Sequence, residues 1–333
     1  MKDTAHRKLF VGPMSVSIVD AVKDSDIAQK VGLIPSRRQI EYSGGYVNNW
    51  TTYEFLKYSQ GTVRCRDHGG PLQGEDIDDG RESLKNDLSP TEHFEIIHID
   101  TWKKEKDICA SANLTGELIK YCSSYNPKVL FEIGTEQGIR PYSIGELEEF
   151  LTIIEKKIGP LFERVLYCVI QGGTGLSGTS NTGSFDPDKC ASMISLCHNR
   201  GLLSKEHNGD YLSDYEISRR FELGLDSINI APELGVNESS VFLDRLDSHQ
   251  FDEVFEICYK SKKWKKWFPT EYSPVSDVDR LKLTMASCHY SFSHLKIKKL
   301  MKDVGISPEL LVDMHKQFLV SKLNSMGSYN GKV

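Results

Sequence analysis

The segment from Phe94 to Gly134 decides the fold: it reads FEIIHID at 94–100, continues through a helical pattern at 107–121, and ends in KVLFEIG at 128–134. The two outer runs are short and rich in β-branched and aromatic residues, as buried strands are. Two parallel strands need a crossover of a dozen or more residues, usually a helix. The segment therefore predicts a βαβ unit.

The same alternation continues toward both ends of the chain. Further strand-like runs are LFVGPMSV at 9–16, a weak run at 37–42, TVRCRDH at 62–68, RVLYCVIQ at 164–171, a weaker run leading to His207, and DSINIA at 226–231. Helical patterns fall at 18–31, 51–60, 143–159, 186–201 and 213–223. Ser143 and Glu146 predict a capping box, and Asp186-Pro187 predicts the start of a helix.

Eight strands that alternate with helices favour a closed α/β barrel, the (β/α)8 or TIM barrel. An open, doubly wound parallel sheet is the alternative. We expect residues 1–240 to form the barrel that carries the site. The β signal fades after residue 240, so we expect residues 241–333 to form a C-terminal helical extension packed on the barrel.

Composition narrows the class of protein. The 333 residues carry a formal charge of −6, which argues against nucleic acid as the main partner. No apolar run approaches the roughly 20 residues that span a bilayer, and the N-terminus lacks a secretory apolar core. We therefore expect a cytoplasmic protein with no membrane partner. The eight cysteines form no CxxC pair, so we expect most to be reduced thiols in or near the core.

Polar residues gather where the predicted strands end, which is where barrel enzymes carry their chemistry. These strand-end residues are Asp67, His68, His98, Asp100, Glu132, Glu136, Gln171, His207, Asp210 and Asn229. Two histidines from different strands plus a carboxylate form a set that holds Zn²⁺ or another divalent metal. Such a metal, with an open position, polarises a substrate carbonyl, and a nearby carboxylate moves a proton. Asp67 and Asp100 are the candidates for that proton transfer.

Several residues are candidates for binding a sugar or sugar-phosphate substrate. Arg140, in the loop after the fifth strand, is the best candidate for neutralising an anionic group. Gln171, Gly172 and Gly173 open a Gly-rich loop at 172–183, which is either a mobile lid or a contact for phosphate or sugar. Arg64 and Arg66 either neutralise an anion or pair with buried acidic neighbours.

The order of the strand-end motifs resembles a known family. RDHGGP at 66–71, IHID at 97–100, IGTE at 133–136, HNGDY at 207–211 and SINIAPELG at 227–235 are similar to segments of the tagatose-bisphosphate aldolase accessory-subunit family, within the class II (zinc-dependent) aldolase group. The resemblance covers about residues 8–240. The barrels of this group often pair, so a homo-oligomer or a pairing with a related barrel is compatible with it.

The resemblance also implies roles for single residues. It implies that His68, Glu136 and His207 are the metal ligands, that Asp67 is the acid/base, and that Asn229 contacts an enediolate. It implies that Asp210 contacts either the substrate or the metal ligands. The chain departs from the group at Gln171, where a ligating histidine is usual, which leaves the fourth ligand open. It also departs from the phosphate-binding segments of the group at 207–211 and 229–232, which leaves the phosphorylation state of the substrate open.

Three functions remain open at this point. The first is a metal-dependent aldolase-type lyase that acts on a sugar or sugar phosphate. The second is a sugar or sugar-acid epimerase at the same site, which needs a second proton carrier such as Glu132 or Asp100 beside Asp67. The third is a non-catalytic accessory subunit of an aldolase, and so many polar groups at the barrel mouth argue against it.

Overall fold

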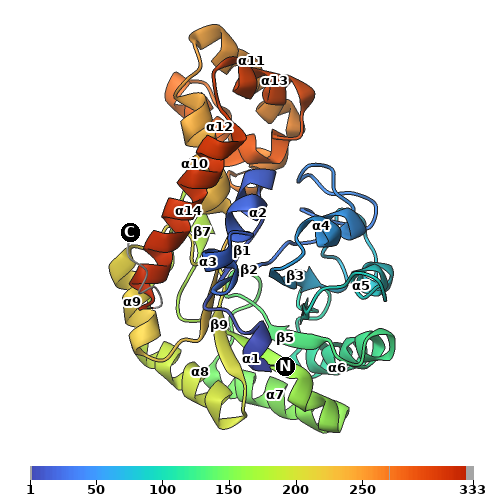
Figure 1. Cartoon of the computed structure of the whole chain (residues 1–333). Coiled ribbons are helices and arrows are strands. Elements are labelled where there is room, and N and C mark those ends of the chain that lie inside the picture. The colour runs from blue at the N-terminus through green and yellow to red at the C-terminus, as the bar shows by residue number, and fades with distance from the viewer. Residues whose placement is uncertain (1, 270, 328–333) are drawn as a thin grey trace.

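The computed structural model describes residues 2–269 and 271–327. Its centre is a closed parallel barrel with the strand order β1-β10-β9-β6-β5-β4-β3-β2 (Figure 1). The barrel strands are β1 Leu9–Val11, β2 Val31–Leu33, β3 Val63–Gly69, β4 Ile96–Ile99, β5 Leu130–Gly134, β6 Val165–Ile170, β9 Leu203–Glu206 and β10 Ser227–Ile230. The predicted (β/α)8 barrel is therefore confirmed, and the open sheet is excluded.

Helices connect the barrel strands and cover the barrel. They are α1 Lys2–Ala5, α2 Val16–Val22, α3 Ser25–Ala28, α4 Thr52–Tyr58, α5 Arg81–Asp87, α6 Ile108–Tyr125, α7 Ile144–Ile158, the short 3-10 helix Gly159–Arg164, α8 Pro187–Asn199 and α9 Asp214–Glu222. The predicted capping box is confirmed, because the Ser143 side chain accepts from Glu146 N–H and the Glu146 carboxylate accepts from Ser143 N–H. Asp186 caps α8, as its sequence predicts.

The second strand lies elsewhere than the sequence predicts. It is Val31–Leu33, which begins at the last residue of the predicted helix 18–31. Residues 37–42, the predicted strand, form a loop. Arg37 in that loop is buried and pairs with Glu41 at 2.5 Å, so polar contacts hold the segment. A strand of three residues is too short to show a period. Its Gly32 leaves room for the ring of Phe10, which a Cβ would meet at 2.4 Å.

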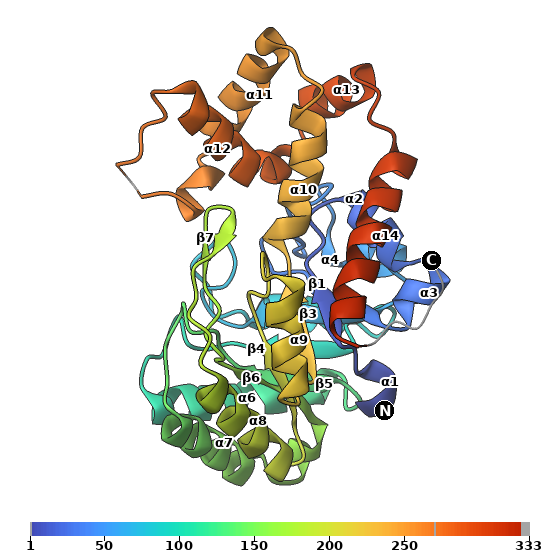
Figure 2. The same cartoon turned by 90° about the vertical axis from the view of Figure 1, so that its left-hand side faces the viewer.

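The C-terminal part forms a helical lobe beyond one end of the barrel (Figures 1 and 2). It consists of α10 Pro232–Leu243, α11 Ser248–Ser261, α12 Asp277–Ser287, α13 Leu295–Asp303, α14 Pro308–Ser325 and the short 3-10 helices Lys263–Lys266 and Cys288–Ser291. The predicted helical extension is therefore confirmed. Its own apolar cluster includes Phe242, Phe255 and Trp264. The proposed boundary at residue 240 falls inside α10 and stays a proposal.

Helix α14 returns from the lobe to the barrel. It packs against α2, which follows β1, and against α9, which precedes β10. Leu319 and Leu323 of α14 belong to the apolar core of the barrel, whereas Leu311 belongs to the cluster of the lobe. The extension thus supplies the final helix of the barrel wall. Among the described residues, none of the helices combines the length and the apolar character that crossing a bilayer requires.

Two of the arginines near the third strand are structural. Arg66 is fully buried, and its guanidinium donates to both carboxylate oxygens of Asp87 at 2.8 and 2.5 Å and to the carbonyl of Ile40 at 2.8 Å. Arg64 pairs with Glu95 at 2.5 Å. The alternative in which these residues pair with acidic neighbours is therefore confirmed. All eight cysteines are free, and among them Cys109 alone is exposed.

Replacing Arg66 with methionine is expected to lower the free energy of unfolding by about 3–5 kcal/mol, because it leaves the Asp87 carboxylate buried without its partner. The matched control is Arg219→Met, which removes an exposed pair with Glu222 and is expected to cost about 1 kcal/mol or less. Urea denaturation measures both. A loss at Arg66 no larger than that at Arg219 would contradict the assignment.

Candidate metal centre

The strand period places the site in the upper interior of the barrel, the half at the C-terminal ends of the strands. An apolar layer that includes Phe10, Cys65 and Ile96 fills the lower interior. Two residues further along a strand, the next inward position is Asp67 in β3 and His98 in β4, since alternate residues of a strand face the same side. The polar residues at the strand ends therefore form one layer above an apolar floor.

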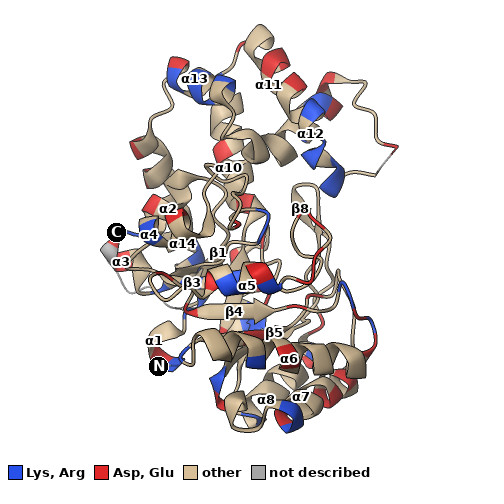
Figure 3. Ribbon diagram, turned by 90° about the vertical axis from the view of Figure 1, so that its right-hand side faces the viewer, with Lys and Arg blue, Asp and Glu red and all other residues tan. Residues whose placement is uncertain are grey.

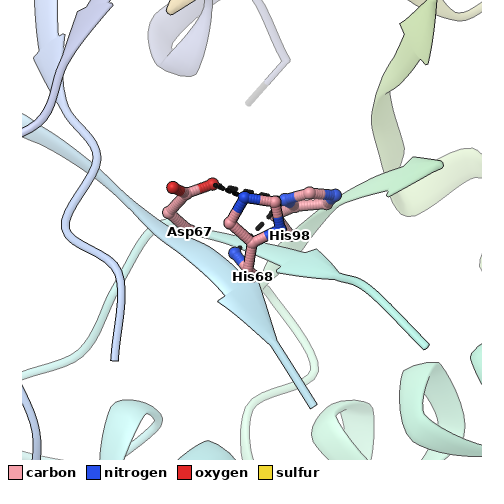
Figure 4. Close-up of side chains that lie close together, drawn as sticks. All are labelled: Asp67, His68 and His98. Atoms are coloured by element: carbon pink, nitrogen blue, oxygen red, sulfur yellow. Dashed lines mark hydrogen bonds and ion pairs between the residues drawn. The ribbon is translucent and has the colours of Figure 1, made fainter. Parts of the chain in front are cut away.

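An irregularity in β3 brings two neighbouring side chains into the same site. The register of β3 against β4 shifts between Arg66 and Gly69, and His68 has a left-handed backbone with φ 47°. In a regular strand, Asp67 and His68 would point to opposite faces. The bulge turns both toward the barrel axis, where they lie close to His98 (Figure 4).

Two histidines of the layer are each oriented by a buried carboxylate. His68 Nδ1 lies 2.7 Å from Asp100 Oδ2, and His207 Nε2 lies 2.6 Å from Glu132 Oε1. Asp100 and Glu132 are fully buried. A carboxylate accepts a hydrogen bond from the N–H of a neutral imidazole, so the other ring nitrogen carries the lone pair. In the neutral forms of the two histidines, His68 Nε2 and His207 Nδ1 are thus the nitrogens that carry lone pairs.

These two nitrogens converge on Glu136. Its Oε2 lies 3.6 Å from His68 Nε2 and 3.7 Å from His207 Nδ1. This oxygen is buried and has no hydrogen-bond partner among the described residues. A metal about 2.0–2.1 Å from each of three tetrahedral ligands separates them by roughly 3.4 Å. The three predicted ligands thus fit a divalent metal. A metal there would also satisfy the Glu136 oxygen that has no hydrogen-bond partner.

Asp67 lies beside this triad. Its Oδ1 is 3.6 Å from His68 Nε2 and 3.5 Å from His98 Nδ1. His98 is fully buried, its Nε2 lies 3.1 Å from the carbonyl of Gly134, and its Nδ1 lies 3.3 Å from the N–H of His68. Nε2 therefore donates and Nδ1 accepts, so His98 is a fixed neighbour of the Asp67 carboxylate.

The charges of the cluster shift its pKa values strongly. Burial acts to lower the pKa of His68, but the carboxylates of Asp67, Glu136 and Asp100 raise it to about 10. Burial acts to raise the pKa of Asp67, but His68 and the neighbouring histidines hold it well below its usual range. The metal-free cluster therefore keeps a proton on His68. A divalent cation would replace that proton, since a ligating histidine must be neutral.

The interior of the barrel holds one charged residue that sequence reasoning missed. Lys205 is fully buried, donates to Glu132 Oε2 at 2.6 Å, and lies 3.8 Å from the centre of the Phe10 ring. Burial acts to raise the pKa of Glu132, but Lys205, His98 and His207 hold it well below its usual range. Lys205 is two residues before His207, so the strand period was the signal that would have found it.

Asn229 reaches the polar layer from β10. It is 7% exposed, and its Oδ1 has no hydrogen-bond partner among residues 2–269 and 271–327. A buried amide without a partner costs about 1–3 kcal/mol, so it is a group that a ligand would satisfy. This geometry is compatible with the predicted contact to substrate.

The structure does not bring two predicted substrate contacts into the layer. The Gln171 side-chain amide donates to the carbonyls of Thr135 and Arg140 at 3.0 and 2.9 Å, and its oxygen accepts from Tyr142 N–H at 3.0 Å. Gln171 thus fixes the loop that carries Glu136. The Arg140 guanidinium is engaged as well, by the Glu146 carboxylate at 2.9 Å.

The Gly-rich loop and Asp210 are tied to their surroundings. Gly172 and Gly173 lead into the hairpin of β7 Leu176–Ser177 and β8 Ser180–Asn181, which rises from the barrel on the side of the lobe (Figure 2). Asn181 of this hairpin donates to the carbonyls of Asn208 and Asp210 at 2.9 Å each. Asp210 Oδ1 accepts the N–H groups of Ala231 and Glu233 at 2.8 Å, so it caps the start of α10.

Asp210→Asn is expected to change how stability depends on pH. Burial raises the pKa of Asp210 to about 7, so the folded protein favours the protonated form. The stabilisation from that proton is complete at pH below about 4 and is lost as the pH rises to about 7. The asparagine variant should therefore gain stability relative to wild type over this window. Denaturation at pH 4, 5.5 and 7.5 measures it, with the exposed Asp188→Asn as control, and parallel curves would refute it.

Comparisons with known proteins agree with the fold. No protein-family profile and no curated protein sequence matches the chain. Among solved structures, a probable tagatose 6 phosphate kinase from Sinorhizobium meliloti 1021 is similar with a TM-score of 0.73 and 15% identity, over 96% of this chain and 93% of that one. The fructuronate-tagaturonate epimerase UxaE from Cohnella laeviribosi has a TM-score of 0.68 and 11% identity, over 98% and 82%.

The YdjI aldolase from Escherichia coli K12 is similar with a TM-score of 0.54 and 13% identity, over 99% of this chain and 94% of that one. At these identities the likeness concerns the fold, which the chain shares with barrels described as an aldolase, an epimerase and a probable kinase.

Proposed function

We propose that the protein is a metal-dependent enzyme that cleaves a carbon–carbon bond in a sugar or sugar phosphate, as an aldolase-type lyase does. The observation that carries this proposal is the convergence of His68 Nε2 and His207 Nδ1 on the orphaned Glu136 Oε2, at 3.6 and 3.7 Å. A divalent metal such as zinc, held by these three atoms, would supply Lewis-acid polarisation of a substrate carbonyl.

The chain's own residues would carry the remaining steps. Asp67 would take the proton of the substrate hydroxyl next to the breaking bond. The side-chain nitrogen of Asn229 would donate to the oxygen on which negative charge develops, and its unpaired Oδ1 would accept from a substrate hydroxyl. The buried apolar layer that includes Phe10 and Cys65 would keep water from entering the site through the lower interior of the barrel. The similar solved barrels include an aldolase and an epimerase, which is compatible with chemistry of this kind.

The geometry favours the lyase over the epimerase. An epimerase needs two proton carriers, and the second would be Asp100 or Glu132. Both oxygens of Asp100 are engaged, by His68 and by Trp102 N–H at 3.0 Å. Both oxygens of Glu132 are engaged, by His207 and by Lys205. Asp67 is thus the one carboxylate of the three that is left free to exchange a proton with a substrate.

The purified protein is expected to hold one divalent metal ion per chain. His207→Ala should abolish that binding, and Glu132→Gln should weaken it about 10–100-fold, because it removes the carboxylate that orients His207. The matched control is His198→Ala, which breaks a histidine–carboxylate pair with Asp226 on the barrel exterior and should leave metal binding unchanged. Elemental analysis and calorimetry measure both quantities. Wild-type protein that takes up no metal would end the proposal.

Asp67→Asn should keep the metal and lose turnover at least about 100-fold, since it removes the base but none of the three ligands. Turnover is measured on a panel of ketose phosphates and sugar acids, with products analysed by mass. A lyase yields two shorter fragments, whereas an epimerase yields an isomer of equal mass that gains deuterium in heavy water. Undiminished turnover in this variant would remove Asp67 from its role.

A further inference from the structure

A basic run of the lobe reaches a loop of the barrel. It reads KSKKWKK at 260–266, and its last four residues form the 3-10 helix Lys263–Lys266. This helix packs against α11 and α12, and Figure 3 shows basic ribbon beside α12. Trp264 anchors it in the apolar cluster of the lobe. The Lys263 ammonium pairs with the carboxylate of Glu75, in the loop that follows β3. The lobe thus contacts the end of the barrel where the metal centre lies.

A second loop, between β2 and β3, links the lobe to the metal centre. At its start, the carbonyl of Pro35 accepts from the N–H of Asp67 at 2.9 Å. Further along, the N–H of Tyr46 donates to the carbonyl of Arg38 at 3.1 Å. The carbonyl of Tyr46 in turn accepts from the hydroxyl of Ser293 in the lobe at 2.6 Å. The exposed Arg38 therefore belongs to a loop that is tied to Asp67 on one side and to the lobe on the other.

Lys103 lies close to both parts. It follows Asp100 by three residues, in the loop after β4. Its electrostatic neighbours are two cations, Arg38 and Lys266, and two carboxylates of the metal centre, Asp100 and Glu136. The Lys103 side chain reaches solvent, but protein surrounds much of it, and this desolvation together with the two cations lowers its pKa. Three cations, here called the basic cluster (Arg38, Lys103 and Lys266), therefore gather beside the metal centre from two barrel loops and the lobe.

The positive charges of the basic cluster have no partners of their own. Within residues 2–269 and 271–327, none of its three charged ends takes part in an ion pair or a hydrogen bond, and Lys266 lies over the ring of Trp267 at 4.5 Å. Of the two carboxylates near Lys103, Asp100 is engaged by buried neighbours and Glu136 is a candidate metal ligand. Like charges that are held together repel one another, and a bound anion would offset this repulsion.

A buried histidine of the lobe lies near Lys266. His289 is 1% exposed, and neither of its ring nitrogens has a hydrogen-bond partner among the described residues. Burial lowers the pKa of His289 to about 3, with a smaller contribution from the charge of Lys266, so the imidazole is neutral. A neutral imidazole offers one donor and one acceptor. The lobe therefore keeps unsatisfied polar groups beside Lys266, which a hydroxylated ligand would satisfy.

We propose that the basic cluster binds the anionic end of the substrate, a phosphate or a carboxylate, while the reacting carbonyl lies at the metal centre. This role presupposes the proposed function, because the metal centre has to hold the other end of the same molecule. Arg140, the residue that the sequence predicted for this contact, is engaged by Glu146 instead. The lobe becomes part of the active site, since Lys266 belongs to it. A neutral sugar would leave the basic cluster unpaired, so the site selects anionic sugars.

The test measures binding of glycerol 3-phosphate, glycerate and glycerol to the full-length protein by calorimetry. Glycerol 3-phosphate should bind at millimolar concentration or below, glycerate more weakly because it carries less charge, and glycerol not measurably. Lys103→Met and Lys266→Met should each weaken the binding of glycerol 3-phosphate at least about fivefold. The matched controls are the exposed neighbours in the same loop and helix, and Lys104→Met and Lys265→Met should change it less than about twofold. Tighter binding of glycerate with the same dependence on Lys103 and Lys266 would identify the anionic end as a carboxylate.

Metal content separates this proposal from the proposed function. Both methionine variants should keep the metal of the wild type, because neither lysine is a candidate ligand, and circular dichroism should show an unchanged fold. Anion binding that depends on Lys103 and Lys266 in a protein that takes up no metal would end the proposed function and support the anion site. The anion site is overturned if wild-type protein binds neither anion, if both variants bind them as the wild type does, or if the controls lose as much affinity.

Discussion

The pairing of each candidate histidine ligand with a buried carboxylate is the interaction on which the site depends. Asp100 and Glu132 decide which nitrogen of His68 and of His207 carries the proton, and hence which nitrogen faces the barrel axis. Burying these carboxylates is costly, and the cost is offset by the histidines and, for Glu132, by Lys205. The same charges that make the interior unfavourable for an apolar core make it favourable for a cation.

An irregular backbone in β3 places two consecutive side chains in the same site, which a regular strand cannot do. A strand offers one inward side chain in every two residues, yet Asp67 and His68 are consecutive and both lie in the site. The bulge in β3 and the left-handed backbone of His68 make this arrangement. A non-glycine residue in that region is held there at a cost, and such outliers concentrate at functional sites. The strain is local to the two residues whose proximity matters most.

The sequence predicted the barrel and the layer of polar strand ends, because both follow from periods that are visible in single strands. It missed β2, since three residues carry no period and Gly32 has no side chain to contribute one. It also missed Lys205, although its place two residues before His207 marks an inward position; its partners Glu132 and Phe10 come from other strands. Arg140 and Gln171 looked available for substrate because a linear pattern does not reveal their partners, the Glu146 carboxylate in the first turn of α7 and the carbonyl of Thr135 after β5.

The chain order of the wall helices has a consequence for how the molecule is made. Helix α14 completes the barrel wall between α9 and α2, but residues 244–307 separate it from α10 in the sequence. During synthesis the last strand, β10, is finished long before the helix that covers its side of the barrel. Until the lobe has emerged, α2 and α9 lack the cover of α14. An incomplete chain would therefore leave the apolar surface under α14 exposed to solvent, and such surfaces promote aggregation.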